Sequence, residues 1–195
     1  MQIVLASHNA HKLEELSRIL KPHLPGVELV SYIGPEPAET GTTFAENALL
    51  KARAACEHTG LPAIADDSGI CVDILGGSPG IFSARWSGPA RSDGENVDLL
   101  LWQLSDIDAV HRGAEFVCAA AFALPDGGED VRIGTWRGQI LRERAGSGGF
   151  GYDPIFKPDD TDLSAAELTQ AQKDQLSHRA RAFTNLAEVI AQLSD

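Results

Sequence analysis

The first third of the chain pairs short apolar runs with a helical repeat. Residues 3–6 are apolar throughout, which is typical of a buried strand. Leucine and isoleucine then recur at helical spacing from Leu13 to Leu20, and Pro22 marks the end of that helix. A second strand is predicted over residues 27–32, and an acidic, glycine-containing loop follows it. This order of elements is typical of a mixed α/β protein.

Capping patterns mark the later helices, with Ser or Thr three residues before Glu. Three such patterns begin at Thr43, Ser92 and Ser164, and the first of these helices is expected to continue to about Cys56. A last helix is expected from about Ser177. Its predicted apolar face consists of Phe183, Leu186, Ile190 and Leu193.

Further strands are predicted in the middle of the chain. Residues 63–65 are an apolar run that leads into Asp66-Asp67-Ser68-Gly69, and residues 70–75 predict another strand. Residues 115–124 and 131–141 flank Asp126-Gly127-Gly128, which predicts a hairpin. Because no repeat, linker or low-complexity segment interrupts residues 1–195, we expect a single domain, as one folding unit or as two lobes with a cleft between them.

Composition narrows the function classes. The 195 residues carry a formal net charge of −12, which argues against a DNA or RNA partner because such binding needs clustered Lys and Arg. A small phosphorylated ligand is compatible with this net charge, since a local pocket binds it. The longest apolar stretch, residues 116–124, is far shorter than the ~20 residues of a membrane helix. With three cysteines, no metal-ligand spacing and no leader segment, we expect a cytoplasmic protein with reduced thiols and no membrane partner.

The turn after the first strand is the first candidate for chemistry. Ser7-His8-Asn9-Ala10-His11-Lys12 lies where a helix begins, and its free backbone N–H groups favour a phosphate there. Ser7 and Asn9 add hydrogen-bond donors, and Lys12 adds a positive charge. An ordinary helix cap explains the same residues equally well. A Walker A loop is excluded, because the chain contains no Gly-x-x-x-x-Gly-Lys-[Ser/Thr].

Asp66 and Asp67 are the second candidate. Two adjacent carboxylates directly after a buried strand are costly unless something uses them. Strand alternation sends the two side chains to opposite faces, so one can enter a cleft to ligate Mg²⁺ or activate water. Glu39, in the acidic loop, offers a second oxygen ligand. Each has a simpler explanation when taken alone: a polar turn for the Asp pair, and a solvated charge for Glu39.

Basic and aromatic side chains supply the remaining candidates. Lys51 shares a helix face with Asn47, although an isolated helical Lys usually extends to water. Residues 146–151 match Gly-x-Gly-x-x-Gly, but prolines follow instead of a helix, which argues against a dinucleotide site. Phe150 and Tyr152 in this region either stack on a nucleobase or pack into the core.

Lys173 and the start of the last helix complete the set. His178 and Arg179 occupy the first helical turn, where cations oppose the helix dipole. Basic residues placed against that rule indicate an anion or a carbonyl group nearby. The alternative is two exposed charges without a role.

Six motifs occur in a specific order along the chain. They are Ser-x-Asn-x-x-Lys, Thr-Phe-x-Glu-Asn-Ala-x-x-Lys-Ala, Asp-Asp-Ser-Gly, Pro-Gly-Ile-Phe-Ser-Ala-Arg, Gly-Gly-Phe-Gly-Tyr-Asp-Pro and Ser-His-Arg. In this order the motifs closely resemble those of the inosine/xanthosine triphosphate pyrophosphatase (RdgB-like) family, and the resemblance covers residues 2–193.

The resemblance implies an elongated, two-lobed α/β fold with a long central mixed sheet flanked by helices and an active-site cleft between the lobes. It also implies a homodimer that uses Mg²⁺ to convert ITP, dITP and XTP to the monophosphate and pyrophosphate. Asp67 is then the catalytic base, and Glu39 and Asp67 serve the metal. The implied substrate-binding residues are Ser7, His8, Asn9, Ala10, His11, Lys12, Lys51, Ser68, Phe150, Gly151, Tyr152, Asp153, Lys173, His178 and Arg179.

Two departures and three rivals qualify the resemblance. His8 stands where the family usually has Gly and is expected to restrict the backbone, and Trp86 stands where Tyr is expected. A Maf-like nucleotide pyrophosphatase would open with Ser-x-Ser-x-Arg-Arg, which the chain lacks. A haloacid-dehalogenase phosphatase would need Asp-x-Asp-x-Thr, which is also absent. A nucleotide-binding sensor without catalysis is the alternative from another class.

Overall fold

Strand β1 (Gln2–Leu5) organises the N-terminal part of the sheet. In the computed structural model, which describes residues 1–8 and 10–192 but not the side chains of Ala10 and His11, β1 pairs in parallel with β2 (Glu28–Ser31). It also pairs in parallel with β3 (Ala63–Val72), where Val4 lies opposite Ala63. Short apolar runs that are buried on both sides are typical of such parallel strands.

The sheet contains six strands in the order β2-β1-β3-β4-β5-β6. The remaining strands are β4 (Gly113–Ala123), β5 (Glu129–Ile140) and β6 (Phe156–Pro158). β4 and β5 form the expected hairpin, closed by a hydrogen bond from the Leu124 N–H to the Gly128 carbonyl. β5 pairs with β6 in the antiparallel sense, so the sheet is mixed and the predicted α/β class is confirmed.

Helices follow the predicted order except at Ser164. The helices are α1 (Ala10–Leu20), α2 (Phe44–Thr59), α3 (Asp93–Gln103), α4 (Gln170–Leu176) and α5 (His178–Gln192). Short 3₁₀ turns are η1 (Asp73–Leu75), η2 (Gly80–Arg85), η3 (Ala109–His111) and η4 (Asp153–Ile155). Of the predicted apolar face of the last helix, Phe183, Leu186 and Ile190 are buried, whereas Leu193 lies outside the described residues. No helix in the described part is long and apolar enough to cross a membrane.

The chain divides into two compact units. Unit 1 comprises Met1–Asp67, Cys118–Gly134 and Asp174–Asp195. Unit 2 comprises Ser68–Val117 and Thr135–Lys173. The single-domain organisation stays a prediction, as does the cleft between the lobes.

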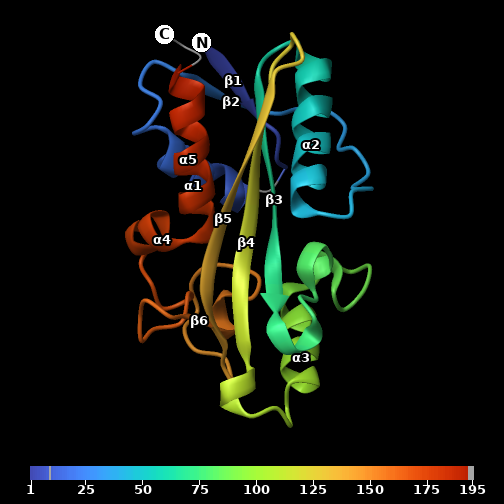
Figure 1. Cartoon of the computed structure of the whole chain (residues 1–195), viewed down its shortest axis with the longest axis vertical. Helices are drawn as coiled ribbons and strands as arrows, with labels where there is room; N and C mark the ends of the chain where they lie inside the picture. The colour runs from blue at the N-terminus through green and yellow to red at the C-terminus, as the bar shows by residue number, and fades with distance from the viewer. Residues whose placement is uncertain (9, 193–195) are drawn as a thin grey trace. The chain divides into compact units, whose positions relative to one another are not determined.

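Unit 1 has helices on both faces of its strands. Alternate residues of β1 separate into two apolar clusters: Ile3 and Leu5 pack with α1 and α5, whereas Val4 packs with α2. Figure 1 shows the same division, with α1 and α5 together on one side of these strands and α2 on the other. The period-two alternation of a strand therefore decides which helix each side chain meets.

Unit 2 packs around aromatic side chains. Phe156 meets Phe116 edge-on at 4.6 Å between ring centroids and Trp136 at 5.7 Å. Arg112 is buried nearby and donates to the carbonyl oxygens of Ile140 and Leu141 at 2.9 and 2.6 Å. This guanidinium satisfies backbone acceptors where the strand ends, which is how a buried cation is tolerated.

Strand β3 corrects one sequence expectation. Two strands were expected around a polar turn, yet residues 63–72 form one continuous strand that contains Asp66, Asp67 and Ser68. The polar residues are accommodated within the strand because the Asp66 side chain forms ion pairs and Asp67 accepts a hydrogen bond. The carboxylates are therefore held by a strand, which is more rigid than a turn.

The helix expected at Ser164 is absent from the structure, and α4 begins at Gln170 instead. Ser164 forms one hydrogen bond of the predicted capping box, because its N–H donates to Glu167 Oε2 at 2.8 Å. Its hydroxyl, however, donates to the Ala145 carbonyl at 2.7 Å and is used to fasten a loop. The functioning capping box belongs to Thr169 and Gln172, which exchange hydrogen bonds at 2.9 and 3.3 Å.

The start of α5 depends on a glycine in β5. A Cβ atom placed on Gly134 would lie 2.1 Å from the His178 carbonyl oxygen and 2.5 Å from the Ala182 nitrogen. Both are backbone atoms, so neither can move without shifting the helix. Gly134 therefore lets the first turn of α5 approach the strand directly.

We predict that Gly134→Ala destabilises the protein by about 1–3 kcal/mol, because the methyl group overpacks a backbone contact. Urea denaturation measures the loss. Gly128→Ala is the matched control, since its Cβ would meet the movable tip of Leu124 at 3.0 Å. Equal midpoints for the two variants would contradict the assigned role of Gly134.

Candidate active site

Asp66 stands at the centre of a buried charge cluster in unit 1. Its carboxylate accepts hydrogen bonds from Lys12 Nζ at 3.0 and 3.2 Å, and Arg179 Nε lies 3.5 Å from Oδ2. The Asp66 residue is only 3 % exposed. Burial alone would raise the pKa of Asp66, but the cations Lys12, Arg179 and Lys51 outweigh it and hold that pKa well below its usual range. Asp66 is thus a fixed negative charge.

Asp67 points to the opposite face of the strand, as predicted from strand alternation. Its Oδ2 accepts a hydrogen bond from Asn47 Nδ2 at 3.2 Å, and Lys51 Nζ lies 3.6 Å from its Oδ1. Burial raises the pKa of Asp67, and the nearby carboxylates of Glu39 and Asp66 add to the rise against the opposing effect of Lys51 and Asn47. A carboxylate with a raised pKa is a better proton acceptor near neutral pH.

Lys51 is held between the two predicted metal ligands. Its ammonium group contacts Glu39 Oε1 at 2.9 Å and Asp67 Oδ1 at 3.6 Å. Burial alone would lower the pKa of Lys51, but Asp66, Asp67 and Glu39 together raise it. The structure therefore brings Glu39, Lys51 and Asp67 together, although the solvated-charge explanation for Glu39 and Lys51 was the simpler one.

The structure describes part of the turn between β1 and α1. Lys12 points to Asp66, and Ser7 is half-buried after β1. His8 stacks on the Tyr32 ring with 5.7 Å between centroids and lies 3.3 Å from Glu36 Oε1. Arg91 is the one described non-glycine residue with a positive φ angle, so His8 does not enter that region, which favours glycine. Asn9 lies outside the described residues, as do the side chains of Ala10 and His11.

The first turn of α5 carries its two basic residues into the protein. His178 and Arg179 are both buried, which excludes the alternative of two exposed charges. Arg179 Nη1 lies 3.3 Å from Glu15 Oε2, and its Nε faces Asp66. The anion that the unusual helix start predicted is therefore present, and it is supplied by the protein's own carboxylates.

Glu15 was missed by sequence reasoning. It lies three residues after Lys12 in α1 and is buried beside Arg179, next to the apolar face of that helix. An acidic residue between apolar helix positions was the available signal, since a buried carboxylate needs a cation. The identity of that cation was not readable, because Glu15 and Arg179 are 164 residues apart.

Unit 2 holds the remaining predicted residues. Asp153 Oδ2 accepts hydrogen bonds from Lys173 Nζ at 2.6 Å and from the Phe150 N–H at 2.9 Å. Lys173 Nζ also lies 5.6 Å from the centroid of the Phe150 ring. The structure thus brings Phe150, Asp153 and Lys173 into one cluster, all within the same unit.

The other predicted residues of unit 2 have separate roles. Tyr152 is buried and donates from its hydroxyl to the Ser83 carbonyl at 2.8 Å, so its ring packs in the core and is not displayed for stacking. Gly151 donates its N–H to Asp93 Oδ2 at 2.9 Å. Ser68 follows Asp67 within β3 and is half-buried.

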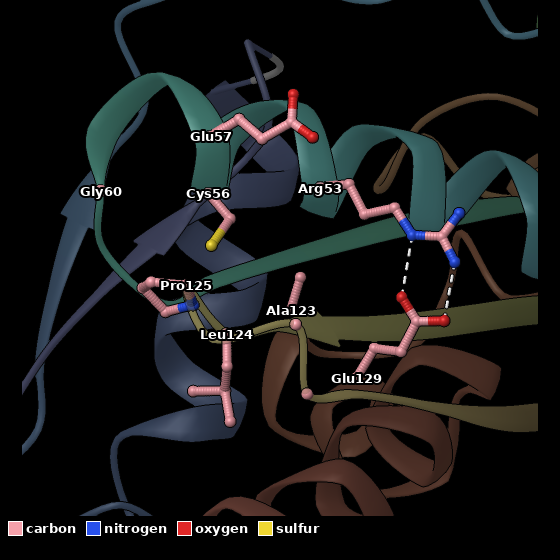
Figure 2. A pocket seen from close by; sticks show the side chains of 10 residues that line it. Arg53, Cys56, Glu57, Gly60, Ala123, Leu124, Pro125 and Glu129 are labelled. Atoms are coloured by element: carbon pink, nitrogen blue, oxygen red, sulfur yellow. Dashed lines mark hydrogen bonds and ion pairs between the residues drawn. The ribbon is translucent and has the colours of Figure 1, made fainter.

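A cavity of about 430 Å³ lies elsewhere in unit 1. Figure 2 shows it between the end of α2 and the β4–β5 hairpin, with the Cys56 sulfur and the Leu124 side chain lining it and an Arg53–Glu129 ion pair beside it. Burial raises the pKa of the Cys56 thiol, which keeps it in the unreactive thiol form. None of the predicted catalytic or binding side chains that the structure describes lines this cavity.

The acidic residues permit a metal but do not form a complete protein cage for one. Among residues 1–8 and 10–192, no three His, Cys, Asp or Glu side chains are grouped so that they could hold a metal ion. Glu39 and Asp67 nevertheless share one cation, the Lys51 ammonium. Two carboxylates that converge on a cation fit Mg²⁺, which usually takes one or two carboxylates together with substrate phosphates.

The fold and the buried carboxylates define an α/β protein with a buried cluster of charged side chains, and comparison with known proteins identifies its family. A model of the Ham1 family matches residues 3–189. The chain therefore belongs to the Ham1 family. This confirms the resemblance stated from the motifs.

Individual relatives support the same assignment. The dITP/XTP pyrophosphatase of Streptomyces coelicolor is 53 % identical, over 98 % of this chain and 98 % of that protein. The protein of the same name from Frankia alni is 54 % identical, over 99 % and 98 %.

Solved structures agree with the sequence comparisons. A HAM1 protein from Coxiella burnetii matches with a TM-score of 0.89 and 38 % identity, covering 98 % of this chain and 99 % of that one. A nucleoside-triphosphatase / dITP/XTP pyrophosphatase from Mycobacterium abscessus matches with a TM-score of 0.78 and 51 % identity, covering 97 % and 99 %.

We predict that Asp66→Asn destabilises the protein by about 3–5 kcal/mol, because it leaves Lys12 and Arg179 buried with one carboxylate fewer. Since the pKa of Asp66 is lowered in the folded state, its stabilisation is complete above the ordinary Asp pKa of about 3.9 and is lost as the pH falls below that value. Urea denaturation at several pH values measures the gap to the unmodified protein.

Asp67→Asn is the matched control for this prediction. Because burial raises the pKa of Asp67, removing its charge relieves a desolvation cost and should leave the free energy of unfolding nearly unchanged. A larger loss in Asp67→Asn than in Asp66→Asn would contradict the division of roles between the two carboxylates.

Proposed function

We propose that the chain hydrolyses deaminated purine nucleoside triphosphates, namely ITP, dITP and XTP, to the nucleoside monophosphate and pyrophosphate. The observation that carries this proposal is the Asp67–Lys51–Glu39 arrangement in a chain of the Ham1 family, whose relatives bear the name dITP/XTP pyrophosphatase. Attack of water on a phosphate requires a base to accept the proton and a cation to offset the developing charge, and a carboxylate with a raised pKa next to a lysine supplies both. The enzyme removes these nucleotides from the pool in the cytoplasm.

Asp67 is the proposed catalytic base. It accepts a proton from water while the water oxygen forms a bond to the α-phosphorus. The bond between that phosphorus and the bridging oxygen breaks, and pyrophosphate leaves with the bonding electrons. The raised pKa of Asp67 supports this role, since a carboxylate of ordinary pKa is a weaker base at neutral pH.

The neighbouring residues supply charge. Lys12 and Lys51 in unit 1, and Lys173 in unit 2, are proposed to offset the negative charge that develops on the leaving pyrophosphate. Glu39 and Asp67 would hold Mg²⁺, which when bound neutralises phosphate charge and orients the phosphoryl oxygens. The backbone of the opening turn, from Ser7 to Lys12, is proposed to bind the phosphates at the start of α1.

Arg179 is proposed to select the base. A guanidinium has only donors, so it pairs with the carbonyl oxygen of hypoxanthine or xanthine and not with the amino group of adenine. Glu15 and Asp66 fix its position from two directions. With adenine bound, the buried guanidinium would face an amino group and lose its hydrogen bond. This loss costs binding free energy, so we expect strong discrimination against adenine.

The proposal includes a homodimer, as the family resemblance implies. Trp102 in α3 is 73 % exposed, and Val110 in the same unit is 82 % exposed. A second copy of the chain that packs on these side chains would remove them from water.

We predict that Asp67→Asn lowers turnover of ITP by about two orders of magnitude or more, because the amide keeps the size but loses the basicity of the carboxylate. Steady-state kinetics with saturating Mg²⁺ measure the loss. A variant with near-normal turnover would remove Asp67 from the reaction.

A nucleotide panel tests the bond that is cleaved and the base that is chosen. We predict phosphate release from ITP and XTP only when inorganic pyrophosphatase is added, since α–β cleavage liberates pyrophosphate. ATP should react at least about 100-fold more slowly. Phosphate without the coupling enzyme would indicate cleavage of the terminal phosphate. Preference for TTP or UTP would favour a Maf-like activity, and no turnover of any nucleotide would indicate a binding protein.

A further inference from the structure

Asn47 joins the catalytic strand to the acidic loop. Its side-chain Oδ1 accepts a hydrogen bond from the Gly41 N–H at 2.8 Å, and its Nδ2 donates to Asp67 Oδ2 at 3.2 Å. Gly41 lies two residues after Glu39, the other carboxylate that contacts Lys51. One amide therefore contacts both the proposed base and the loop that carries its partner carboxylate.

Chemistry fixes the orientation of the Asn47 amide. The Gly41 N–H can only donate, so it must face the amide oxygen. An ionised Asp67 can only accept, so it must face the amide nitrogen. Exchange of the amide oxygen and nitrogen would lose both hydrogen bonds, so the amide has a single orientation. We call such a buried asparagine, which is hydrogen-bonded on both sides, a brace.

Burial makes the loss of either hydrogen bond costly. Asn47 is 1 % exposed, so water cannot replace a lost partner. The loop also approaches the amide as closely as a glycine allows, because a Cβ on Gly41 would lie 2.7 Å from Asn47 Oδ1. Gly41 is therefore required for the loop to reach the brace.

The chain contains a second brace of the same design. Asn96 follows the Ser92–Glu95 capping box of α3, just as Asn47 follows the Thr43–Glu46 box of α2. Asn96 is also 1 % exposed, and its Oδ1 accepts from the Ser87 N–H at 2.7 Å while its Nδ2 donates to the Ala84 carbonyl. The two asparagines differ in one respect: Asn96 donates to backbone, whereas Asn47 donates to Asp67.

We propose that Asn47 is a positioning residue, which holds the Asp67 carboxylate and the Glu39 loop in register for the metal and the attacking water. This inference rests on the proposed function. Because Asn47 occupies Oδ2 of Asp67, it leaves Oδ1 facing Lys51, where the second carboxylate converges. The same capping-box design that fastens a loop in unit 2 is used here to align catalytic carboxylates.

Three variants separate the two bonds of Asn47. Asn47→Ala removes both, and we expect turnover of ITP at saturating Mg²⁺ to fall by about 10- to 100-fold. Asn47→Asp still accepts from Gly41 but cannot donate to Asp67 and adds a repelling charge, so it should lose as much turnover. Gly41→Ala displaces the loop and keeps the Asp67 bond, so its main effect should be an increase of about 10-fold in the Mg²⁺ concentration needed for half-maximal activity.

Hydrogen–deuterium exchange of the protein without metal or nucleotide supplies a readout that does not depend on activity. We expect faster exchange of the Gly41 amide in Asn47→Ala and retained protection in Asn47→Asp. The matched control is Asn96→Ala, which should speed exchange at Ser87 and leave the turnover of ITP unchanged.

Two results would overturn the proposal: unchanged turnover in Asn47→Asp, or an equal loss of turnover in Asn96→Ala and Asn47→Ala. An unmodified protein that fails to hydrolyse ITP would instead refute the proposed function. In that case, unchanged exchange at Gly41 in Asn47→Ala would still refute the brace.

Discussion

Two adjacent carboxylates on one buried strand impose the central constraint of this protein. Asp66 and Asp67 are both buried in β3, and the alternation of the strand sends them to opposite faces. A buried carboxylate must be neutralised or protonated. The protein satisfies this requirement with cations on both faces: Lys12 and Arg179 pair with Asp66, and Lys51 pairs with Asp67.

The two faces then differ in chemistry. On the face of α1 and α5, several cations meet Asp66 and keep its pKa low, so that side chain is an anchor for the helix starts. On the face of α2, burial raises the pKa of Asp67, and Glu39, which contacts the same lysine, adds to the rise. The structural role of Asp66 and the proposed catalytic role of Asp67 are thus separated by one residue of strand register, and a slip by one position would exchange the two faces.

Much of the fold was predictable from local pattern. The buried strands, the hairpin, the caps at Thr43, Ser92 and Ser177, and the opposite directions of Asp66 and Asp67 follow from periodicity and hydrogen-bonding chemistry. Local sequence patterns gave the wrong secondary structure where contacts with residues distant in the sequence determine it. Ser164 fastens a loop at Ala145 instead of starting a helix, and β3 continues through a polar segment because helices α1, α2 and α5 supply its counter-charges.

The site shows the same limit. The motifs pointed to Asp67, Glu39, Lys51, Lys173 and Arg179, but not to the network that positions them. Glu15 and Asn47 act through contacts with residues 164 and 20 positions away, and no local spacing encodes such contacts. Tyr152, which a motif offered as a stacking ring, is buried with its hydroxyl on Ser83.

The division between the two carboxylates is tested most directly by carbon-13 NMR titration of carboxyl-labelled aspartate in the metal-free protein, with Asp66→Asn and Asp67→Asn to assign the signals. The account predicts that Asp67 titrates above the ordinary Asp pKa of about 3.9, whereas Asp66 stays ionised at lower pH until the protein unfolds. Titration of both groups at the same pH, or in the reverse order, would contradict it.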